Sequence, residues 1–146
     1  MAFDDEKLDI SIFLKQWQTC VDLADRFSKR RDTANNLFVT LNTAIIAGIG
    51  VITGIVSMFL SIVGFVISII WLLDNRYYRQ ISIAKYTVIC DLETLLPASP
   101  LTKEWEICKN NKHFFEATHI EALLIFSFIS IYLFVIVISL SGARLW

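Results

Sequence analysis

Residues 33–73 read TANNLFVTLNTAIIAGIGVITGIVSMFLSIVGFVISIIWLL, and no side chain in this stretch is ionisable. The 41 residues would extend about 60 Å as one helix, at about 1.5 Å per residue. The hydrocarbon core of a bilayer is only about 30 Å thick. The stretch therefore predicts two membrane-spanning helices, residues 33–54 and 57–73, joined by a tight turn at Ile55 and Val56.

A second uncharged run extends from residue 122 to residue 143, and its centre is apolar on every side. It predicts a third span over residues 122–142. The composition points the same way, because 55% of the 146 residues are hydrophobic, against about 45–50% in ordinary soluble proteins. The sequence thus predicts an all-α membrane protein, a single unit with three transmembrane helices.

The segments outside the spans are amphipathic. In residues 1–32 apolar side chains recur every three or four positions, and the same period continues after the second span until Pro97. We therefore expect both hairpin helices to extend beyond the membrane, with further helices within residues 74–121. Ser99 and Pro100 have the residue types of an N-cap and a first helical residue.

These amphipathic faces are larger than one hairpin can bury. The chain should therefore assemble as a homo-oligomer, because apolar surface outside the membrane is stabilised by burial against protein. We expect Trp17, Phe27 and Ile81 to lie at or near the contacts between subunits.

The basic residues indicate the orientation. With the N-terminus inside, 12 of the 13 Lys and Arg residues, all but Arg144, lie on the cytosolic side, as the positive-inside rule requires. We expect a bacterial inner-membrane protein with a cytosolic N-terminus and an external C-terminus. Cys20, Cys90 and Cys108 would then face the reducing cytosol, so we expect buried thiols and no disulfide.

Small and polar residues recur along the first two spans at alternating spacings of four and three. This period of about 3.5 residues keeps them on one helix face, and small residues let helix backbones approach closely. The first-helix seam comprises Asn36, Thr40, Thr43, Ala47, Gly50 and Gly54, and the second-helix seam comprises Ser57, Ser61, Gly64 and Ser68.

Folding the chain at Ile55 and Val56 would bring the two seams together. We interpret them as the internal packing face of a helical hairpin, and the alternative is that they line an aqueous pore in an oligomer. The expected pairs are Gly54 with Ser57, Gly50 with Ser61, Ala47 with Gly64, Thr43 with Ser68, Thr40 with Trp71 and Asn36 with Asn75.

Asn35 and Asn42 lie one heptad apart beside the first-helix seam. An amide in hydrocarbon needs a hydrogen-bonding partner. We expect either an interhelical hydrogen bond, within or between subunits, or a polar ring around a central opening. The third span offers Ser127, Ser130 and Ser139 for such contacts, and we expect it to be the most lipid-exposed helix.

Motifs of catalysis are absent from the sequence, which has no phosphate-binding glycine loop, nucleophile elbow or zinc-protease motif. Glu116 and His119 have the spacing of di-iron helical bundles, but those need a second such pair, and His113 is the only other histidine. We expect Glu116, His119 and Glu121 to anchor the third span. We expect no enzymatic activity, no cofactor and no metal.

The charges exclude a further class of function. The 13 basic and 14 acidic residues nearly cancel, so the chain has no overall positive field to attract nucleic acid.

Four stretches carry a resemblance to a known family. They are residues 20–48 (CVDLADRFSKRRDTANNLFVTLNTAIIAG), residues 78–97 (YRQISIAKYTVICDLETLLP), Glu104 with Trp105, and residues 118–121 (THIE). In these the chain resembles the RipA family of octameric bacterial membrane proteins. The resemblance implies a small inner-membrane protein that forms a homo-octamer, and it implies no catalytic residue.

Two functions fit these expectations. The first is a structural or scaffolding oligomer, in contact with membrane lipid and with copies of itself, whose cytosolic helices form a ring that could dock a cytosolic protein partner. The second is a channel-like or membrane-perturbing effector gated from the cytosolic side.

Overall fold

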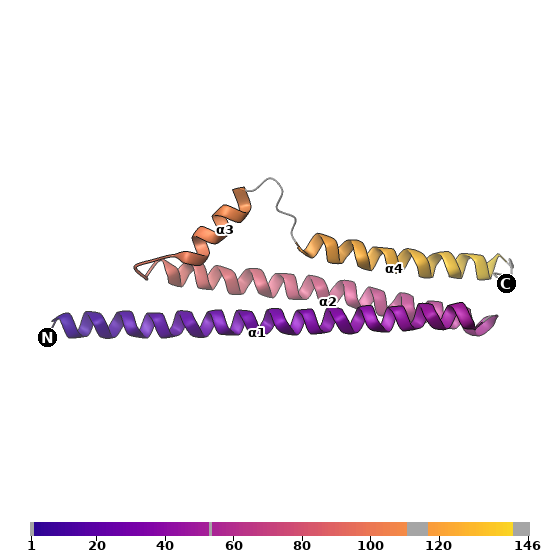
Figure 1. Cartoon of the computed structure of the whole chain (residues 1–146), viewed down its shortest axis with the longest axis horizontal. Coiled ribbons are helices and arrows are strands. Elements are labelled where there is room, and N and C mark those ends of the chain that lie inside the picture. Colours follow the sequence, from indigo (N-terminus) through magenta and orange to yellow (C-terminus); the bar gives the residue numbers. More distant parts are fainter. Residues whose placement is uncertain (1, 53, 111–116, 142–146) are drawn as a thin grey trace. The chain divides into compact units, whose positions relative to one another are not determined.

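The described residues form four helices (Figure 1). The computed structural model describes the backbone of residues 2–52, 54–110 and 117–141; within these ranges, the side chains of residues 2–9, 108–109 and 117–118 lie outside the description. The helices are α1 (Ala2–Val51), α2 (Ile55–Glu93), α3 (Pro100–Asn110) and α4 (Ala117–Leu140). The expectations for the side chains of Cys108, His113 and Glu116 therefore lie outside the described residues.

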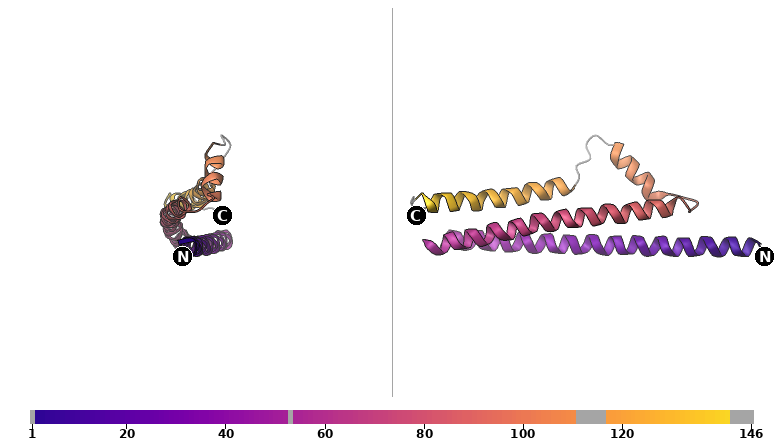
Figure 2. Two further views of the ribbon diagram at one scale, coloured as in Figure 1. Left: turned by 90° about the vertical axis from the view of Figure 1, so that its left-hand side faces the viewer. Right: turned by 180° about the vertical axis from the view of Figure 1, so that it is seen from behind.

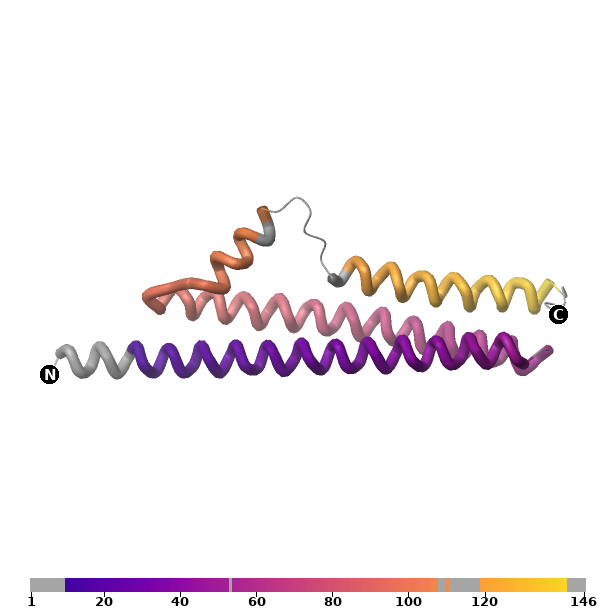
Figure 3. The backbone as a smooth tube through the Cα atoms, viewed as in Figure 1, coloured from indigo at the N-terminus to yellow at the C-terminus, as the bar shows by residue number. Residues whose placement is uncertain are grey.

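Three of the helices are long and apolar enough to cross a membrane, over Ile10–Val51, Ile55–Glu93 and His119–Leu140. This confirms the predicted all-α class with three candidate spans. Figure 3 follows α1 without a break from its amphipathic part into its apolar part. The two prolines of the chain, Pro97 and Pro100, both lie after α2, so neither α1 nor α2 contains the residue that most often interrupts a helix.

The described helices divide into two compact units. The first, here called the amphipathic unit, takes residues 1–30 and 78–115; the second, here called the membrane unit, takes residues 31–77 and 116–146. The membrane unit contains all three stretches that the sequence predicts to span the bilayer. Each unit is described by itself below.

The turn between α1 and α2 lies earlier than predicted. The N–H of Ile52 donates to the carbonyl of Gly48 at 3.0 Å, and Gly54 has a φ of 82°, a left-handed conformation that glycine adopts without steric cost. The next residue, Ile55, already begins α2. Ile55 and Val56, the predicted centre of the turn, are therefore helical.

In the amphipathic unit, an aromatic contact joins α1 to α2. The ring of Phe27 lies 4.9 Å from the ring of Tyr78, centroid to centroid. The ammonium of Lys85 lies 5.4 Å from the Phe27 centroid, within the range of a cation–π interaction. Ala24 and Ile89 are buried in the same unit. Phe27 thus has partners within one chain, and a role for it at a subunit contact stays a prediction.

A buried carboxylate holds the start of α3. Glu93 is 1% exposed; one oxygen accepts from the N–H of Leu101 at 3.0 Å, and the other accepts from the N–H and hydroxyl of Thr102 at 2.9 and 2.7 Å. The first N–H groups of a helix have no partner inside it, and a negative charge there is favourable. Pro100 begins α3 as expected, but the capping side chain is that of Glu93 and not of Ser99.

The surroundings of Glu93 set its acidity. Burial alone would raise its pKa, but the hydrogen bonds from Thr102 and Leu101, together with the nearby indole of Trp17, outweigh burial and lower the pKa below the ordinary value of 4.5. A lowered pKa means that the charged carboxylate stabilises the fold above pH 4.5. This stabilisation is lost as the pH falls through the folded-state pKa.

We expect Glu93→Gln to lower the free energy of unfolding at pH 7 by about 1–3 kcal/mol, because neutral hydrogen bonds replace charge-assisted ones. The measurement is denaturant unfolding of the full chain in detergent, followed by tryptophan fluorescence. The difference from the wild type should shrink below pH 4.5, where wild-type Glu93 also becomes neutral.

The control is Glu104→Gln, an exposed position on α3, which should change stability little. An equal loss of stability in both variants, or a difference that does not depend on pH, would contradict the capping role.

Candidate functional site

Polar side chains of α1, α2 and α4 meet inside the membrane unit, and Figure 2 shows these helices running side by side. This polar cluster has two layers. The inner layer comprises Asn42, Ser68 and Tyr132, and the outer layer comprises Arg31, Asn35, Trp71, Asn75 and Glu121.

Asn42 is the centre of the inner layer and is completely buried. Its amide oxygen accepts from the hydroxyls of Ser68 on α2 and Tyr132 on α4, each at 2.9 Å. Its amide nitrogen donates to the carbonyl of Phe38 at 2.8 Å, one turn earlier on α1. A polar group in hydrocarbon has no water to bind and must bond to protein. Through these bonds the Asn42 amide links α1 to α2 and α4.

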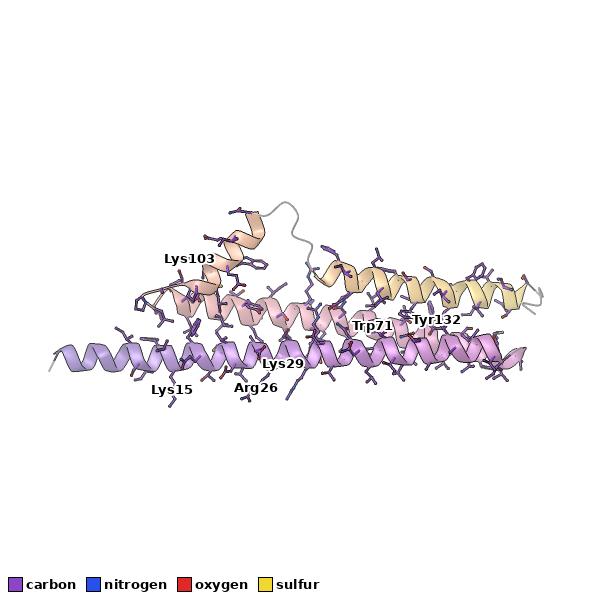
Figure 4. All side chains as sticks on the ribbon, in the orientation of Figure 1. Lys15, Arg26, Lys29, Trp71, Lys103 and Tyr132 are labelled. Carbon is purple, nitrogen blue, oxygen red and sulfur yellow. The ribbon has the colours of Figure 1, made fainter. Side chains whose placement is uncertain are left out.

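Gly64 makes room for this arrangement. It is buried on α2, and a Cβ atom built there would overlap the aromatic ring and the hydroxyl of Tyr132. Tyr132 is itself completely buried, and Figure 4 marks it in the membrane unit. Only glycine lets the tyrosine ring pass close enough to α2 for its hydroxyl to reach Asn42.

The outer layer pairs opposite charges. The carboxylate of Glu121 on α4 forms a salt bridge with Arg31 on α1 and accepts a hydrogen bond from Asn35 at 3.0 Å. The same arginine donates to the amide oxygen of Asn75 on α2 at 3.1 Å. The two charged side chains are only 16% and 21% exposed. Their mutual neutralisation is what makes charges tolerable so close to an apolar span.

Trp71 connects the outer layer to an aromatic stack. Its indole N–H donates to the amide oxygen of Asn35 at 2.8 Å. Its ring lies nearly parallel to that of Phe38, at 5.7 Å and 8°, and is tilted against Phe128 at 6.1 Å. Trp71 is 1% exposed. The aromatic contacts fix the orientation of the indole and therefore of its N–H group.

The two seams differ in their burial. All four second-helix seam residues are buried, whereas every residue of the first-helix seam is exposed in the single chain. A Cβ atom added at Gly50 would meet nothing within 4 Å. The interpretation of the first-helix seam as the internal packing face of the hairpin is therefore wrong.

The register of the hairpin explains this correction. Trp71 bonds to Asn35 in place of the predicted Thr40, and Asn75 bonds to Arg31 in place of the predicted Asn36. Both observed partners lie five residues earlier on α1, in agreement with the earlier turn. At 3.6 residues per turn, a shift of five residues rotates the contact face by about 140°. The predicted seam is thereby turned away from α2.

The predicted pairs that lie closer to the turn also differ from the observed contacts. Ser68 bonds to Asn42 and not to its neighbour Thr43. Gly64 meets Tyr132 of α4, where Ala47 of α1 was expected. The second-helix seam therefore packs against two helices.

The third span is more deeply packed than expected. Ile125 and Tyr132 of α4 are completely buried. In the most apolar 18-residue stretch of each helix, the buried share is 6% in α1, 11% in α4 and 28% in α2. Within one chain α1 is thus the least covered of the three helices. The expectation that the third span is the most lipid-exposed helix concerns the assembled protein and stays a prediction.

Sequence reasoning missed two members of the cluster, Tyr132 and Arg31, and it did not identify the partners of Glu121. One signal was available for Tyr132, which is the only tyrosine in the third span and carries a hydroxyl that needs a partner in hydrocarbon. Glu121 was expected to anchor the span, and it does so through Arg31 and Asn35. His119, expected beside it, is exposed.

We expect Gly64→Ala to lower the free energy of unfolding by about 1–3 kcal/mol, because the added methyl group displaces Tyr132 from Asn42. Gly48→Ala is the matched control: its Cβ would meet only Leu60, at 3.7 Å. Since alanine favours a helix over glycine, the control should be neutral or stabilising by up to about 1 kcal/mol. Thermal unfolding in detergent measures both.

A double-mutant cycle tests the cause of this loss. In a Tyr132→Ala background the collision is gone, so Gly64→Ala should cost much less than in the wild type. An equal cost in both backgrounds would show that Gly64 does not act through Tyr132.

Comparison with known proteins gives one family. The octameric membrane protein family (8xMP) matches residues 14–141, a range that contains the whole polar cluster. No curated protein and no solved structure matches the chain. The match confirms the expected self-associating membrane protein and does not carry the narrower name RipA. Because the matched range covers most of its 146 residues, this chain belongs to the octameric membrane protein family.

Proposed function

We propose that the protein is a structural, scaffolding oligomer of the bacterial inner membrane, whose cytosolic helices form a ring that docks other proteins. The observation that carries this proposal is the polar cluster of the membrane unit. Its amides, hydroxyls and charges are hydrogen-bonded to one another across three helices of one chain. A network that joins three helices in this way favours one rigid packing of the helices.

The network also bears on the channel function. Asn35 and Asn42 suggested a polar ring around an opening, yet Asn42 is completely buried and Asn35 bonds to Trp71 and Glu121 of the same chain. These amides stabilise the three-helix unit. They supply no side chain that would coordinate a permeating ion.

We further propose that the chain has no enzymatic activity. The motivation lies in the sequence, since residues 33–73 and 122–143 contain no Asp, Glu, Lys, Arg or His. The strongest charged pair at the edge of the spans, Arg31 with Glu121, is committed to a salt bridge.

One observation favours the second function. The first-helix seam is exposed, and it includes the polar residues Asn36, Thr40 and Thr43. If this face surrounded the centre of the octamer, it could line a channel-like path. The two functions therefore differ in whether the assembled octamer lets solutes cross.

We expect vesicles reconstituted with the purified octamer to retain trapped potassium ions and a small dye as well as protein-free vesicles do. Vesicles treated with an ionophore define full leakage. A protein-dependent leak that scales with the number of octamers per vesicle would contradict the scaffolding function and support the channel.

We propose the orientation that the positive-inside rule predicts, with the N-terminus in the cytosol and the C-terminus outside. A reporter enzyme that works only outside the cytosol should be active when fused after Trp146 and inactive when fused before Met1. Activity of a cytosol-dependent reporter at the C-terminus would contradict an odd number of spans.

A further inference from the structure

The exposed faces of the membrane unit differ in their chemistry. On α2 large apolar side chains are exposed, such as Phe59 and Val63, and α4 exposes Phe134 and Val137 in the same way. These side chains suit lipid tails. The exposed face of α1 instead carries the first-helix seam, with an amide, two hydroxyls and small side chains. Lipid tails offer such a face neither hydrogen bonds nor close packing.

Gly50 is the most informative residue of this face. Glycine has a lower helix propensity than alanine, and Gly50 lies in the last turn of α1, which ends at Val51. Gly64 is required by Tyr132, but nothing in the described part of the chain lies within 4 Å of a Cβ at Gly50. Its own chain therefore gives no packing reason for glycine there. Close approach of another helix would supply one.

A second, independent observation identifies the other helix. The chain belongs to a family of octamers, so each copy must present faces to neighbouring copies of itself. Of the three spans, α1 is the one least covered within a chain. A second copy is thus both required by the assembly and suited to the uncovered face.

We propose that the first-helix seam is a contact face between neighbouring subunits of the octamer, occupied by a membrane helix of a second copy. This deepens the proposed function, since it names the surface through which the scaffold assembles. The heptad spacing gives the left-handed crossing of a coiled coil, and Ala47 and Gly50 let the two backbones approach. The side chains of Asn36 and Thr43 then lie against protein, where they can find hydrogen-bonding partners; the hydroxyl of Thr40 donates to the carbonyl of Asn36 at 2.8 Å.

The contact also has a complementary surface. In a cyclic octamer each contact is heterologous, so the seam of one copy meets a different face of the next copy. The large side chains exposed on α2, such as Phe59 and Val63, are knobs of the size that holes between small residues accept. The same chain thus carries both halves of the contact.

Gly50→Leu tests the proposal, because the added side chain fills the contact face, and its Cβ meets nothing within 4 Å among the described residues. We expect native mass spectrometry in mild detergent to show loss of most of the octamer in favour of smaller species. The helix content and the unfolding temperature of the chain should be retained. An octamer that stays intact would overturn the proposal.

Ser130→Leu is the matched control. Ser130 is exposed on α4 and donates only to the backbone of its own helix, to Phe126 at 2.8 Å, so a leucine there extends an apolar face. The octamer should persist in this variant. Loss of the octamer in Ser130→Leu together with its persistence in Gly50→Leu would overturn the proposal and place the contact on α4.

Photo-crosslinking gives a readout that does not depend on disruption. A diazirine analogue of leucine at Leu41, which is 40% exposed beside the seam, changes the side chain little. Illumination of membranes should yield an adduct at twice the 16.7 kDa mass of the chain. Adducts with lipid alone would overturn the proposal. Neither result depends on whether vesicles leak, so failure here is distinguishable from failure of the scaffolding function.

Discussion

The buried amide of Asn42 is the interaction on which the membrane unit depends. In hydrocarbon it cannot exchange protein partners for water, so the hydroxyls of Ser68 and Tyr132 must both reach it. That requirement sets the rotation of α1 about its axis and the depth of α4. It also explains Gly64, the position on α2 where any larger residue would block the tyrosine. One amide therefore determines how three helices face one another.

The outer layer of the polar cluster repeats this logic with charges. Glu121 receives Arg31 and Asn35 from α1, and the arginine also reaches Asn75 on α2. In this layer the acceptor, Glu121, lies on α4, whereas in the inner layer the acceptor, Asn42, lies on α1. The polar residues exposed on the first span include those of the first-helix seam, and α4 exposes Ser127 and Ser130. The internal packing of the unit and its capacity to assemble are thus two consequences of the same rotation of α1.

The two glycines of the spans illustrate the difference between folding and assembly. Gly64 is needed within the chain, because Tyr132 occupies the space of its missing side chain, whereas Gly50 faces open space in the single chain. The chain belongs to a family of octamers, and the role that we propose for Gly50 is a contact between subunits. The proposed scaffold needs a rigid subunit and a separate contact face; in this proposal Gly64 serves the first and Gly50 the second.

The sequence by itself determined the class of the protein. The length of its uncharged runs requires three spans, the positions of Pro97 and Pro100 leave α1 and α2 unbroken, and family membership follows from residues along most of the chain. It also singled out Asn35, Asn42 and the seams as the informative polar residues. Only the tertiary structure decided which face of α1 meets α2 and that Tyr132 and Glu121 complete the cluster. The reason is geometric: moving the turn by a few residues rotates the contact face of a helix by a large angle, and the partners of Asn42 and Arg31 on α4 lie 90 positions away in the chain, beyond the reach of any local pattern.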